Sequence, residues 1–408
     1  MNIEKKLIPL LRFPEFQGKG EWTIKKIGEI STSFSGGTPI ASTKEYYGGN
    51  IPFIRSGEIN NDHTTLSLTQ MGLDNSSARI VEKGTLLYAL YGATSGEVAI
   101  SKIQGAINQA ILAIIPHDDV NVAFIYHYLK KNKENIVSNY IQGGQGNLSS
   151  AIINALPIAI PSLIEQQKIA ECLSSIDSYI SSISEKVEQL KAHNRSLLQK
   201  LFPQKGQTVP EYRFSEFDTE WRKVALCEIL VERHEHSTIT EDLPQLSFTI
   251  EEGVIYPDNK KTNKRDFLIN DKDHKKYLVT YIDDIIYNPA NVIYGAIHKN
   301  SLCNGVVSPI YKIFSTSQDA SFMEYIVRMP EFIQKMSTYM EGTVLKLRTL
   351  KPESFLKMEV FIAPSLAEQR KIAECLSSVD NTIEYYNQKL VILEQHKKGL
   401  MQQLFPKA

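Results

Sequence analysis

The chain has 408 residues, and its 45 lysines and arginines nearly balance its 46 aspartates and glutamates. At about 100 to 200 residues per domain this length predicts two or three domains. A content of 42% hydrophobic and 22% charged residues is typical of globular proteins and excludes a disordered or fibrous chain. No C-x-x-C pair, secretory h-region or ~18-residue apolar run occurs, so we expect reduced thiols, a cytoplasmic location and no membrane contact.

The first predicted element is a mixed domain over residues 1–160. The runs Ile51 to Arg55 and Thr85 to Leu90 are rich in strand-forming residues, whereas Val122 to Lys131 has helical periodicity. The pairs Gly36-Gly37 and Gly143-Gly144 predict turns in which the backbone can approach a phosphate closely.

A long helix is predicted next, over residues 161–203. Ser162 and Glu165 follow a proline and have the spacing of a capping box, and Phe202-Pro203 predicts the end of the helix. Apolar residues step by four and three between these ends, which is the a/d seam of a coiled coil. The seam residues are Ile169, Leu173, Ile176, Ile180, Ile183, Val187, Leu190, Leu197 and Leu201, with Asn194 at the polar position.

The second half of the chain has the same order. Residues 204–363 contain a predicted strand, Val306 to Phe314, and a predicted helix, Phe322 to Val327, so they form a second mixed domain. Residues 364–408 form a second long helix, with a capping-box pattern at Ser365 and Glu368. Its seam comprises Ile372, Leu376, Val379, Ile383, Tyr386, Leu390, Leu393, Leu400 and Leu404, with Lys397 in the place of Asn194.

The two helices are copies of one sequence. Pro161 to Pro203 and Pro364 to Pro406 share 23 identities in 43 positions at an offset of 203. The domains between them share only fragments, such as Leu86-Leu87-Tyr88 and Ile285-Ile286-Tyr287. A repeat of about 200 residues is far longer than a solenoid period, so it indicates a pseudo-twofold molecule. Each seam could pack on its own domain, on a partner chain or on the other copy; two matching seams favour mutual pairing, and the symmetry favours antiparallel helices.

This arrangement resembles the specificity subunit of type I restriction-modification enzymes. The resemblance rests on the motif P-S-L-x-E-Q-x-K-I-A-x-x-L-x-x-x-D at Pro161 to Asp177 and again at Pro364 to Asp380. Further family-like strings are Gly36 to Pro39 followed by Tyr46-Tyr47, Gly144 to Leu148, and Gly305 to Pro309. The resemblance covers nearly the whole chain.

The resemblance implies an α+β protein in which two mixed α/β target-recognition domains are separated by an antiparallel two-helix coiled coil. Each domain would read one half of a bipartite, asymmetric site in double-stranded DNA. The coiled coil would set the spacer between the half-sites and dock two methylation (M) subunits. These partners would carry S-adenosylmethionine and methylate adenine, and they would in turn bind restriction (R) subunits that use ATP and Mg.

The residues that could contact DNA are polar, basic or aromatic side chains on predicted loops. In the first domain they are Thr38, Lys44, Arg55, Tyr91, Thr94, Ser95, Gln145 and Asn147. In the second domain they are Asn291, Tyr294, Lys299, Lys346 and Arg348, together with the basic run Lys260, Lys261, Lys264, Arg265, Lys272, Lys275 and Lys276. No domain of the chain is basic overall, so the isolated subunit is expected to bind DNA weakly.

The sequence contains none of the motifs that catalysis would require. An adenine methyltransferase needs a [DNS]-P-P-[FYW] motif, and Asn288-Pro289-Ala290-Asn291 lacks the second proline and the aromatic residue. Gly92 to Glu97 has neither the spacing nor the lysine of a phosphate-binding loop. His234 and His236 without further ligands do not indicate a metal site. We therefore expect no catalytic residues, no metal and no cofactor in this chain.

Two other functions are consistent with parts of this pattern. A coiled-coil scaffold that binds only proteins would need the helices but not the loop residues. A self-sufficient methyltransferase would need to bind S-adenosylmethionine in the isolated chain. The duplicated helix beside two divergent domains favours a DNA-recognition and assembly subunit over both.

Overall fold

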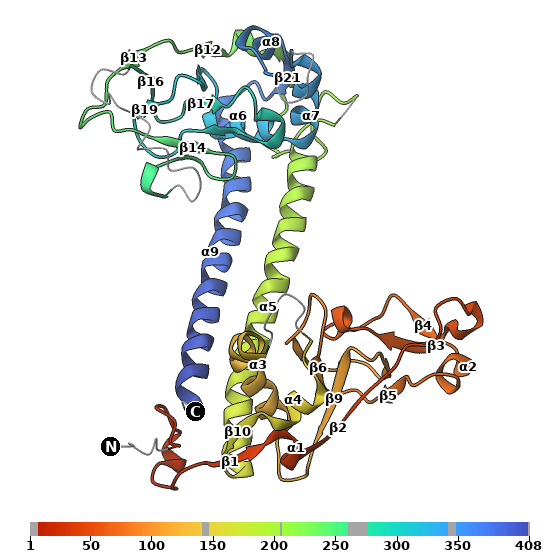
Figure 1. Ribbon diagram of the computed structural model, residues 1–408. Coiled ribbons are helices and arrows are strands. Elements are labelled where there is room, and N and C mark those ends of the chain that lie inside the picture. Colours follow the sequence, from red (N-terminus) through yellow and green to blue (C-terminus); the bar gives the residue numbers. More distant parts are fainter. Residues whose placement is uncertain (1–6, 141–146, 205, 260–275, 342–347, 407–408) are drawn as a thin grey trace. The chain divides into compact units, whose positions relative to one another are not determined.

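The computed structural model describes residues 7–140, 147–204, 206–259, 276–341 and 348–406. The chain divides into two compact units (Figure 1): unit 1 is Met1–Lys186 with Tyr386–Ala408, and unit 2 is Val187–Tyr385. Each unit contains one mixed domain, the beginning of the long helix that follows this domain, and the end of the other long helix.

Unit 1 contains two four-stranded sheets and one two-stranded ribbon. The first sheet has the order β2 (Ser31–Ser35), β9 (Ile111–Pro116), β6 (Leu86–Ala89) and β7 (Val98–Ile100). The second has the order β4 (Ser67–Leu68), β3 (Tyr47–Ile54), β8 (Gly105–Ile107) and β5 (Arg79–Val81). The ribbon joins β1 (Thr23–Lys26) to β10 (Pro157–Ile160). The helices are α1 (Ile27–Ile30), α2 (Gln70–Asp74), α3 (Val122–Tyr140), α4 (Ser150–Ala155) and the start of α5 (Leu163–Leu201).

Unit 2 repeats this plan, with smaller sheets in its described residues. Its four-stranded sheet has the order β12 (Leu230–Glu232), β20 (Lys312–Thr316), β17 (Ile285–Tyr287) and β18 (Ile297–Lys299). The remaining pairs are β13 (His236–Ser237) with β16 (Tyr277–Thr280) and β19 (Gly305–Val307), β14 (Ser247–Thr249) with β15 (Gly253–Ile255), and β11 (Arg222–Ala225) with β21 (Glu359–Ile362). The helices are α6 (Ala320–Arg328), α7 (Pro330–Tyr339), α8 (Pro352–Leu356) and the start of α9 (Leu366–Leu404).

The two domains therefore share a topology that their sequences barely show. In both, an antiparallel ribbon joins the first strand of the domain to its last, and the four-stranded sheet follows the same strand order. The shared fragments Leu86-Leu87-Tyr88 and Ile285-Ile286-Tyr287 lie in β6 and β17, at equivalent positions in these sheets. The predicted α+β fold is confirmed, and so are the long helices.

One predicted element is wrong. Residues 306–314 were expected to form one strand, but they belong to β19 and β20, which lie in different sheets. The amide of Tyr311 bonds to the carbonyl of Ser308 at 3.2 Å, so residues 308–311 form a turn between the strands. Pro309, inside this turn, cannot donate a ladder hydrogen bond, which explains the break.

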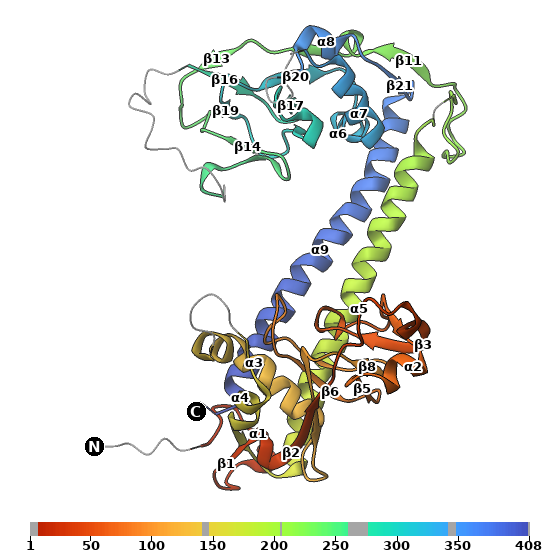
Figure 2. The same ribbon diagram turned by 45° about the vertical axis from the view of Figure 1, so that its right-hand side comes forward.

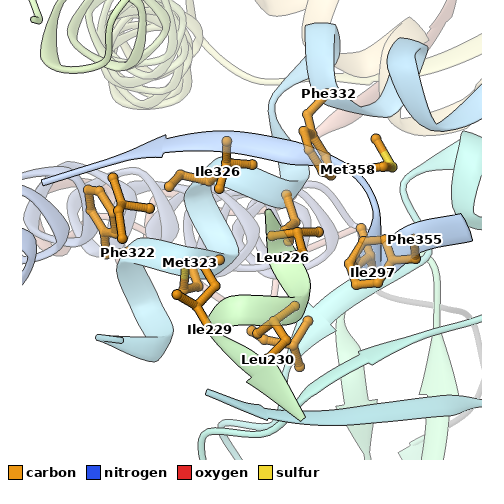
Figure 3. Packing of buried hydrophobic residues seen from close by; sticks show 14 of the residues in the cluster. Leu226, Ile229, Leu230, Ile297, Phe322, Met323, Ile326, Phe332, Phe355 and Met358 are labelled. Atoms are coloured by element: carbon orange, nitrogen blue, oxygen red, sulfur yellow. The ribbon is translucent and has the colours of Figure 1, made fainter. Parts of the chain in front are cut away.

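Apolar side chains from both long helices complete the core of each unit. In unit 1, Phe405 at the end of α9 packs against Trp22 and Phe124, with a ring-centroid distance of 5.2 Å to Phe124. In unit 2, Phe202 at the end of α5 packs in the same way against Trp221 and Phe322, at 5.9 and 5.3 Å. Figure 3 shows part of the unit 2 core, in which Phe322, Met323 and Ile326 of α6 pack near Leu226, Ile229 and Leu230.

A buried glutamate at the start of each long helix binds the entry of its domain. We call this arrangement the helix clamp: Arg12, Trp22 and Glu165 in unit 1, and Arg213, Trp221 and Glu368 in unit 2. In unit 1, Nε of Arg12 donates to Glu165 at 2.7 Å and the Trp22 indole donates at 3.3 Å. In unit 2, the corresponding distances are 2.8 and 3.1 Å. The sequence predicts capping boxes at both glutamates, and in the structure their carboxylates accept these bonds from the preceding domain.

The next residue of the motif ties each helix to α3 or α6. The side-chain oxygen of Gln166 accepts the backbone amide of Asn121 at 2.9 Å, and Gln369 accepts that of Asp319 at the same distance. Asn121 and Asp319 in turn cap their helices through bonds to Phe124 and Phe322. The E-Q pair of the motif is thus a docking device between a domain and the helix that follows it.

The two long helices are antiparallel within each unit. In unit 1, Lys397 near the end of α9 is ion-paired with Asp177 near the start of α5. In unit 2, Asn194 near the end of α5 donates to Asp380 near the start of α9 at 2.5 Å. Asp177 and Asp380 are equivalent residues of the repeat, and so are Asn194 and Lys397. The predicted polar seam residues therefore form two matching pairs.

The predicted seam is buried at both ends of the helices and also in the middle of α5. The buried seam residues are Ile169, Leu173, Ile183, Val187, Leu201, Ile372, Leu376 and Leu404. The other apolar seam residues are half-buried: Ile176, Ile180, Leu190, Leu197, Val379, Ile383, Tyr386, Leu390, Leu393 and Leu400. Lys397 is buried although it is charged, because Asp177 neutralises it.

Candidate nucleic-acid interface

In unit 1, three loops meet at the turn Asn108 to Ala110, which connects β8 to β9. The amide of Asn108 bonds to the carbonyl of Ile54 at 3.3 Å, and the carbonyl of Ala110 accepts the amide of Leu90 at 2.8 Å. Gln109 accepts a hydrogen bond from the Thr38 hydroxyl. Loops that follow β2, β3 and β6 therefore converge at one place, which we call the unit 1 edge.

The glycines before Thr38 make this convergence possible. A Cβ on Gly36 would lie 1.8 Å from the carbonyl oxygen of Ile107, and one on Gly37 would lie 2.3 Å from the Ser77 hydroxyl. The sequence predicted that these glycines let the backbone approach a phosphate, whereas the groups that they approach in the structure are the protein's own Ile107 and Ser77. Their packing positions Thr38, which is exposed.

Arg55 is held at the edge by a buried carboxylate. Its guanidinium donates to both oxygens of Glu58, at 3.0 and 3.2 Å, and also to the Thr65 hydroxyl. Burial would raise the pKa of Glu58, but the hydrogen bonds from Arg55 and Thr65 outweigh it and lower this pKa to about 2. Arg55 is therefore a fixed cation whose side chain remains 44% exposed.

The turn from Tyr91 to Glu97, between β6 and β7, completes the edge. The Ser95 hydroxyl donates to the carbonyl of Leu90 at 3.1 Å, and the Tyr91 ring packs against the core. Thr94 is half-buried in the same turn. The amide of Leu148 also bonds to Leu90, at 2.8 Å, which places the exposed Asn147 beside this turn. Five of the predicted residues in unit 1 thus lie on loops that meet at this edge together with Arg55: Thr38, Tyr91, Thr94, Ser95 and Asn147.

The unit 1 edge described above does not include the other two residues predicted for the first domain. Lys44 lies in a short 3-10 helix before β3, at the opposite end of that strand from Arg55, so the structure does not bring it to the unit 1 edge. Gln145 lies outside the described residues, and so does the predicted Gly143-Gly144 turn.

In unit 2, the equivalent edge is the turn from Asn288 to Ala296, between β17 and β18. Asn291 lies at the start of a 3-10 helix, Val292–Tyr294, and the Tyr294 side chain is 67% exposed. The amide of Leu350 bonds to the carbonyl of Pro289 at 3.0 Å, as Leu148 bonds to Leu90 in unit 1. Arg348, two residues before Leu350, is exposed beside this turn.

Lys299 lies away from this turn. It pairs with Ile285, at the opposite end of the β17–β18 hairpin, and its ammonium group binds Asp283 at 3.0 Å. The structure therefore separates Lys299 from Asn291 and Tyr294. Of the remaining predictions, Lys276 is exposed before β16, and the others lie outside the described residues. These others are Lys260, Lys261, Lys264, Arg265, Lys272, Lys275 and Lys346.

The structure adds residues that sequence patterns did not single out. Gln109 is exposed at the centre of the unit 1 edge, where its amide can present both a donor and an acceptor. In unit 2, Asn259, Asn288 and Asn291 line a cavity of about 390 Å³ beside the β14–β15 hairpin. Asn108 and Gln109 lie in a turn between two buried strands. An amide side chain in such a turn is only a weak indication, in the sequence, of a residue that contacts DNA.

Comparisons with known proteins relate this chain to one family of DNA-specificity proteins. Residues 19–192 match the family model for the type I restriction modification DNA specificity domain. The type I restriction enzyme MjaVIII specificity subunit of Methanocaldococcus jannaschii is 24% identical over 96% of this chain and 92% of its own length. The MjaIX specificity subunit of the same organism is 34% identical, but the alignment covers 42% of this chain and 41% of that subunit. The EcoR124I/EcoR124II specificity subunit of Escherichia coli is 28% identical over 43% of this chain and 45% of that subunit.

A solved structure shares the fold over nearly its full length. The S subunit of a type I restriction-modification system from M. genitalium superposes with a TM-score of 0.64 at 16% identity and covers 98% of this chain and 99% of its own. None of the helices in the described residues combines the length and the hydropathy that a bilayer-spanning segment requires.

Proposed function

We propose that this chain, which is similar over nearly its whole length to a specificity subunit of a type I restriction enzyme, is the non-catalytic subunit that selects the DNA sequence. Its target-recognition domains, residues 1–160 and 204–363, each read one half of a bipartite, asymmetric site. The coiled-coil helices, residues 161–203 and 364–408, set the spacer and dock two methylation subunits, and restriction subunits bind through these. Adenine methylation and DNA cleavage take place in the cytoplasm on the partners, which hold S-adenosylmethionine, ATP and Mg.

This proposal rests on the observation that the two domains share one fold but present different residues at their edges. Both domains share a sheet order and a helix clamp, so each is attached to its helix in the same way. The turns at their edges differ: unit 1 presents Thr38, Arg55 and Gln109, and unit 2 presents Asn291 and Tyr294. Arginine and amide side chains are the common readers of guanine and adenine. Two domains with the same fold and different base-contacting side chains are suited to an asymmetric site, because its two halves differ in sequence.

Selection from a random DNA pool tests the proposal. The full chain, assembled with its cognate methylation subunits, is expected to enrich one bipartite motif. Gln109→Ala is then expected to relax the first half-site by about 1 to 3 kcal/mol and to leave the second unchanged. Tyr294→Ala is the matched variant for the second half-site.

Three results would count against the proposal. Absence of an enriched motif would favour a coiled-coil scaffold that binds only proteins. Relaxation of both half-sites by either variant would contradict the assignment of one domain to one half-site. Binding of S-adenosylmethionine by the isolated chain, measured by calorimetry, would contradict the non-catalytic role.

A further inference from the structure

Unit 1 contains a groove lined with lysines between α3 and the end of α9. Its volume is about 680 Å³, and it is lined by five lysines and three carboxylates. We call it the lysine groove; its lysines are Lys130, Lys131, Lys133, Lys397 and Lys398. Figure 2 shows α3 beside the end of α9 in this unit.

Two of these lysines are not ion-paired within the described residues, although Asp177 and Glu97 act on Lys130 from a longer distance. Lys397 is ion-paired with Asp177, and Lys133 with Glu97. The ammonium group of Lys130 donates to the Tyr126 hydroxyl at 2.8 Å, which leaves its charge in place. Within the described part of the chain, neither Lys130 nor Lys398 forms an ion pair. The groove therefore has a positive charge available for an anion.

The lysine groove begins where the unit 1 edge ends. Glu97, the partner of Lys133, closes the Tyr91 to Glu97 turn of that edge. The turn and the helix are in close contact, because a Cβ on Gly96 would lie 2.6 Å from the side chain of Val137 on α3. A DNA strand that lies on the unit 1 edge can continue over α3 toward Lys130 and Lys398.

The equivalent groove in unit 2 has the opposite balance of charge. It has a volume of about 660 Å³ and is lined by residues that match those of the lysine groove at an offset of 203, such as Arg195 for Lys398 and Asp380 for Asp177. Its walls hold four carboxylates, Glu251, Glu324, Asp380 and Glu384, against three cations. Such a surface repels phosphate, so the two copies have diverged in this property.

We propose that the lysine groove binds the phosphodiester backbone of DNA beside the half-site read by unit 1, and that the groove of unit 2 does not. This inference rests on the proposed DNA-recognition function. The adjoining DNA edge favours a nucleic acid over an acidic segment of a partner protein. Since phosphates contribute no sequence information, the groove adds affinity without changing which bases are selected.

The test measures the salt dependence of DNA binding. A fluorescently labelled duplex that carries the selected site is titrated with the full chain in complex with its methylation subunits, at several salt concentrations. Each neutralised phosphate adds about 0.9 to the slope of log K against log salt concentration. The double variant Lys130→Gln/Lys398→Gln is expected to reduce this slope by about 1 to 2 and to weaken the selected and a scrambled duplex by the same factor. Both lysines are exposed, and equal melting temperatures will verify that the variant is folded.

Arg195→Gln is the matched control, because Arg195 occupies the position of Lys398 in the acidic groove; it should leave the slope unchanged. Uncharged methylphosphonate linkages beside the first half-site should weaken the wild type but not the double variant. An unchanged slope in the double variant would overturn the inference, and so would loss of methylation-subunit binding with unaltered salt dependence, which would identify a protein-docking groove. Failure of the wild type to prefer the selected duplex would instead refute the proposed function itself.

Discussion

At the scale of single residues, the helix clamp explains why a glutamate begins each copy of the repeated motif. The Glu165 carboxylate is buried and accepts bonds from Arg12 and from the Trp22 indole, which lie at the entry of the same domain. Burial of a carboxylate is costly unless hydrogen bonds and an opposite charge compensate it. The clamp supplies both and fixes the domain to its helix.

Replacing this glutamate should destabilise unit 1. In Glu165→Gln the Arg12 guanidinium loses its counter-ion in a buried position, and we expect a loss of about 3 kcal/mol in the free energy of unfolding. Urea denaturation measures this value. Glu188→Gln is the control, since Glu188 is in an exposed pair with Lys191 on the same helix, and it should change stability by less than about 0.5 kcal/mol. A similar loss in both variants would contradict a special role for the clamp.

His127 should make unit 1 sensitive to pH. Its side chain is completely buried, and Nε2 lies 3.2 Å from the Ser174 hydroxyl. Burial, with a contribution from Lys397, lowers the pKa of His127 to about 4, although Asp177 opposes the shift. Between pH 6.5 and 4 the unfolded chain therefore binds a proton that the folded chain does not, so stability falls as the pH falls, by up to about 1.4 kcal/mol per pH unit.

Denaturation curves between pH 7 and 4.5 test this expectation. His127→Gln cannot be protonated and should lose this part of the pH dependence. The equivalent residue of unit 2 is Tyr325, whose hydroxyl donates to Asp380 at 2.6 Å and stays neutral in this range. An identical pH dependence in wild type and variant would show that another group titrates.

At the scale of elements, the helices could be predicted from the sequence and the edges could not. The 39 residues of each long helix follow from a regular apolar spacing and a terminal Phe-Pro, which are local signals. The unit 1 edge depends on the Asn108 to Ala110 turn, which joins loops up to 71 residues away along the chain. Lys299 looked like the other loop candidates, but strand pairing places it at the far end of its hairpin. Tertiary pairing of this kind leaves little local trace.

A residue in a polar pair of the seam should contribute more to stability than the exposed residue beside it. Lys397→Met removes the cation that neutralises Asp177, and we expect a loss of about 1 to 3 kcal/mol in the stability of unit 1, measured by urea denaturation. Lys398→Met, at the exposed neighbouring position, should change stability by less than about 0.5 kcal/mol. Stabilisation by Lys397→Met would show instead that an apolar seam is preferred here.

At the scale of the whole molecule, the proposed spacing role of the helices makes a numerical prediction. Deleting residues 182–188 together with 386–392 removes one heptad from each helix and retains the Asp177–Lys397 and Asn194–Asp380 pairs. Seven residues correspond to about 10 Å of helix, or about 3 base pairs of DNA. Site selection with the assembled complex should therefore recover the same half-sites with a shorter spacer. The original spacer, recovered unchanged, would contradict this role.

The matching pairs Asp177–Lys397 and Asn194–Asp380 also constrain how the repeat can change over time. The acceptor is an aspartate in both copies, whereas the donor is a lysine in one and an asparagine in the other. The donor position can therefore change between lysine and asparagine without losing its partner. Asn194→Lys or Lys397→Asn would each reproduce a pairing that the molecule already contains. Both copies have an aspartate at the acceptor position, so replacing either aspartate would give a pairing that the molecule does not already contain. Duplication thus left the two positions of each pair with unequal freedom to mutate.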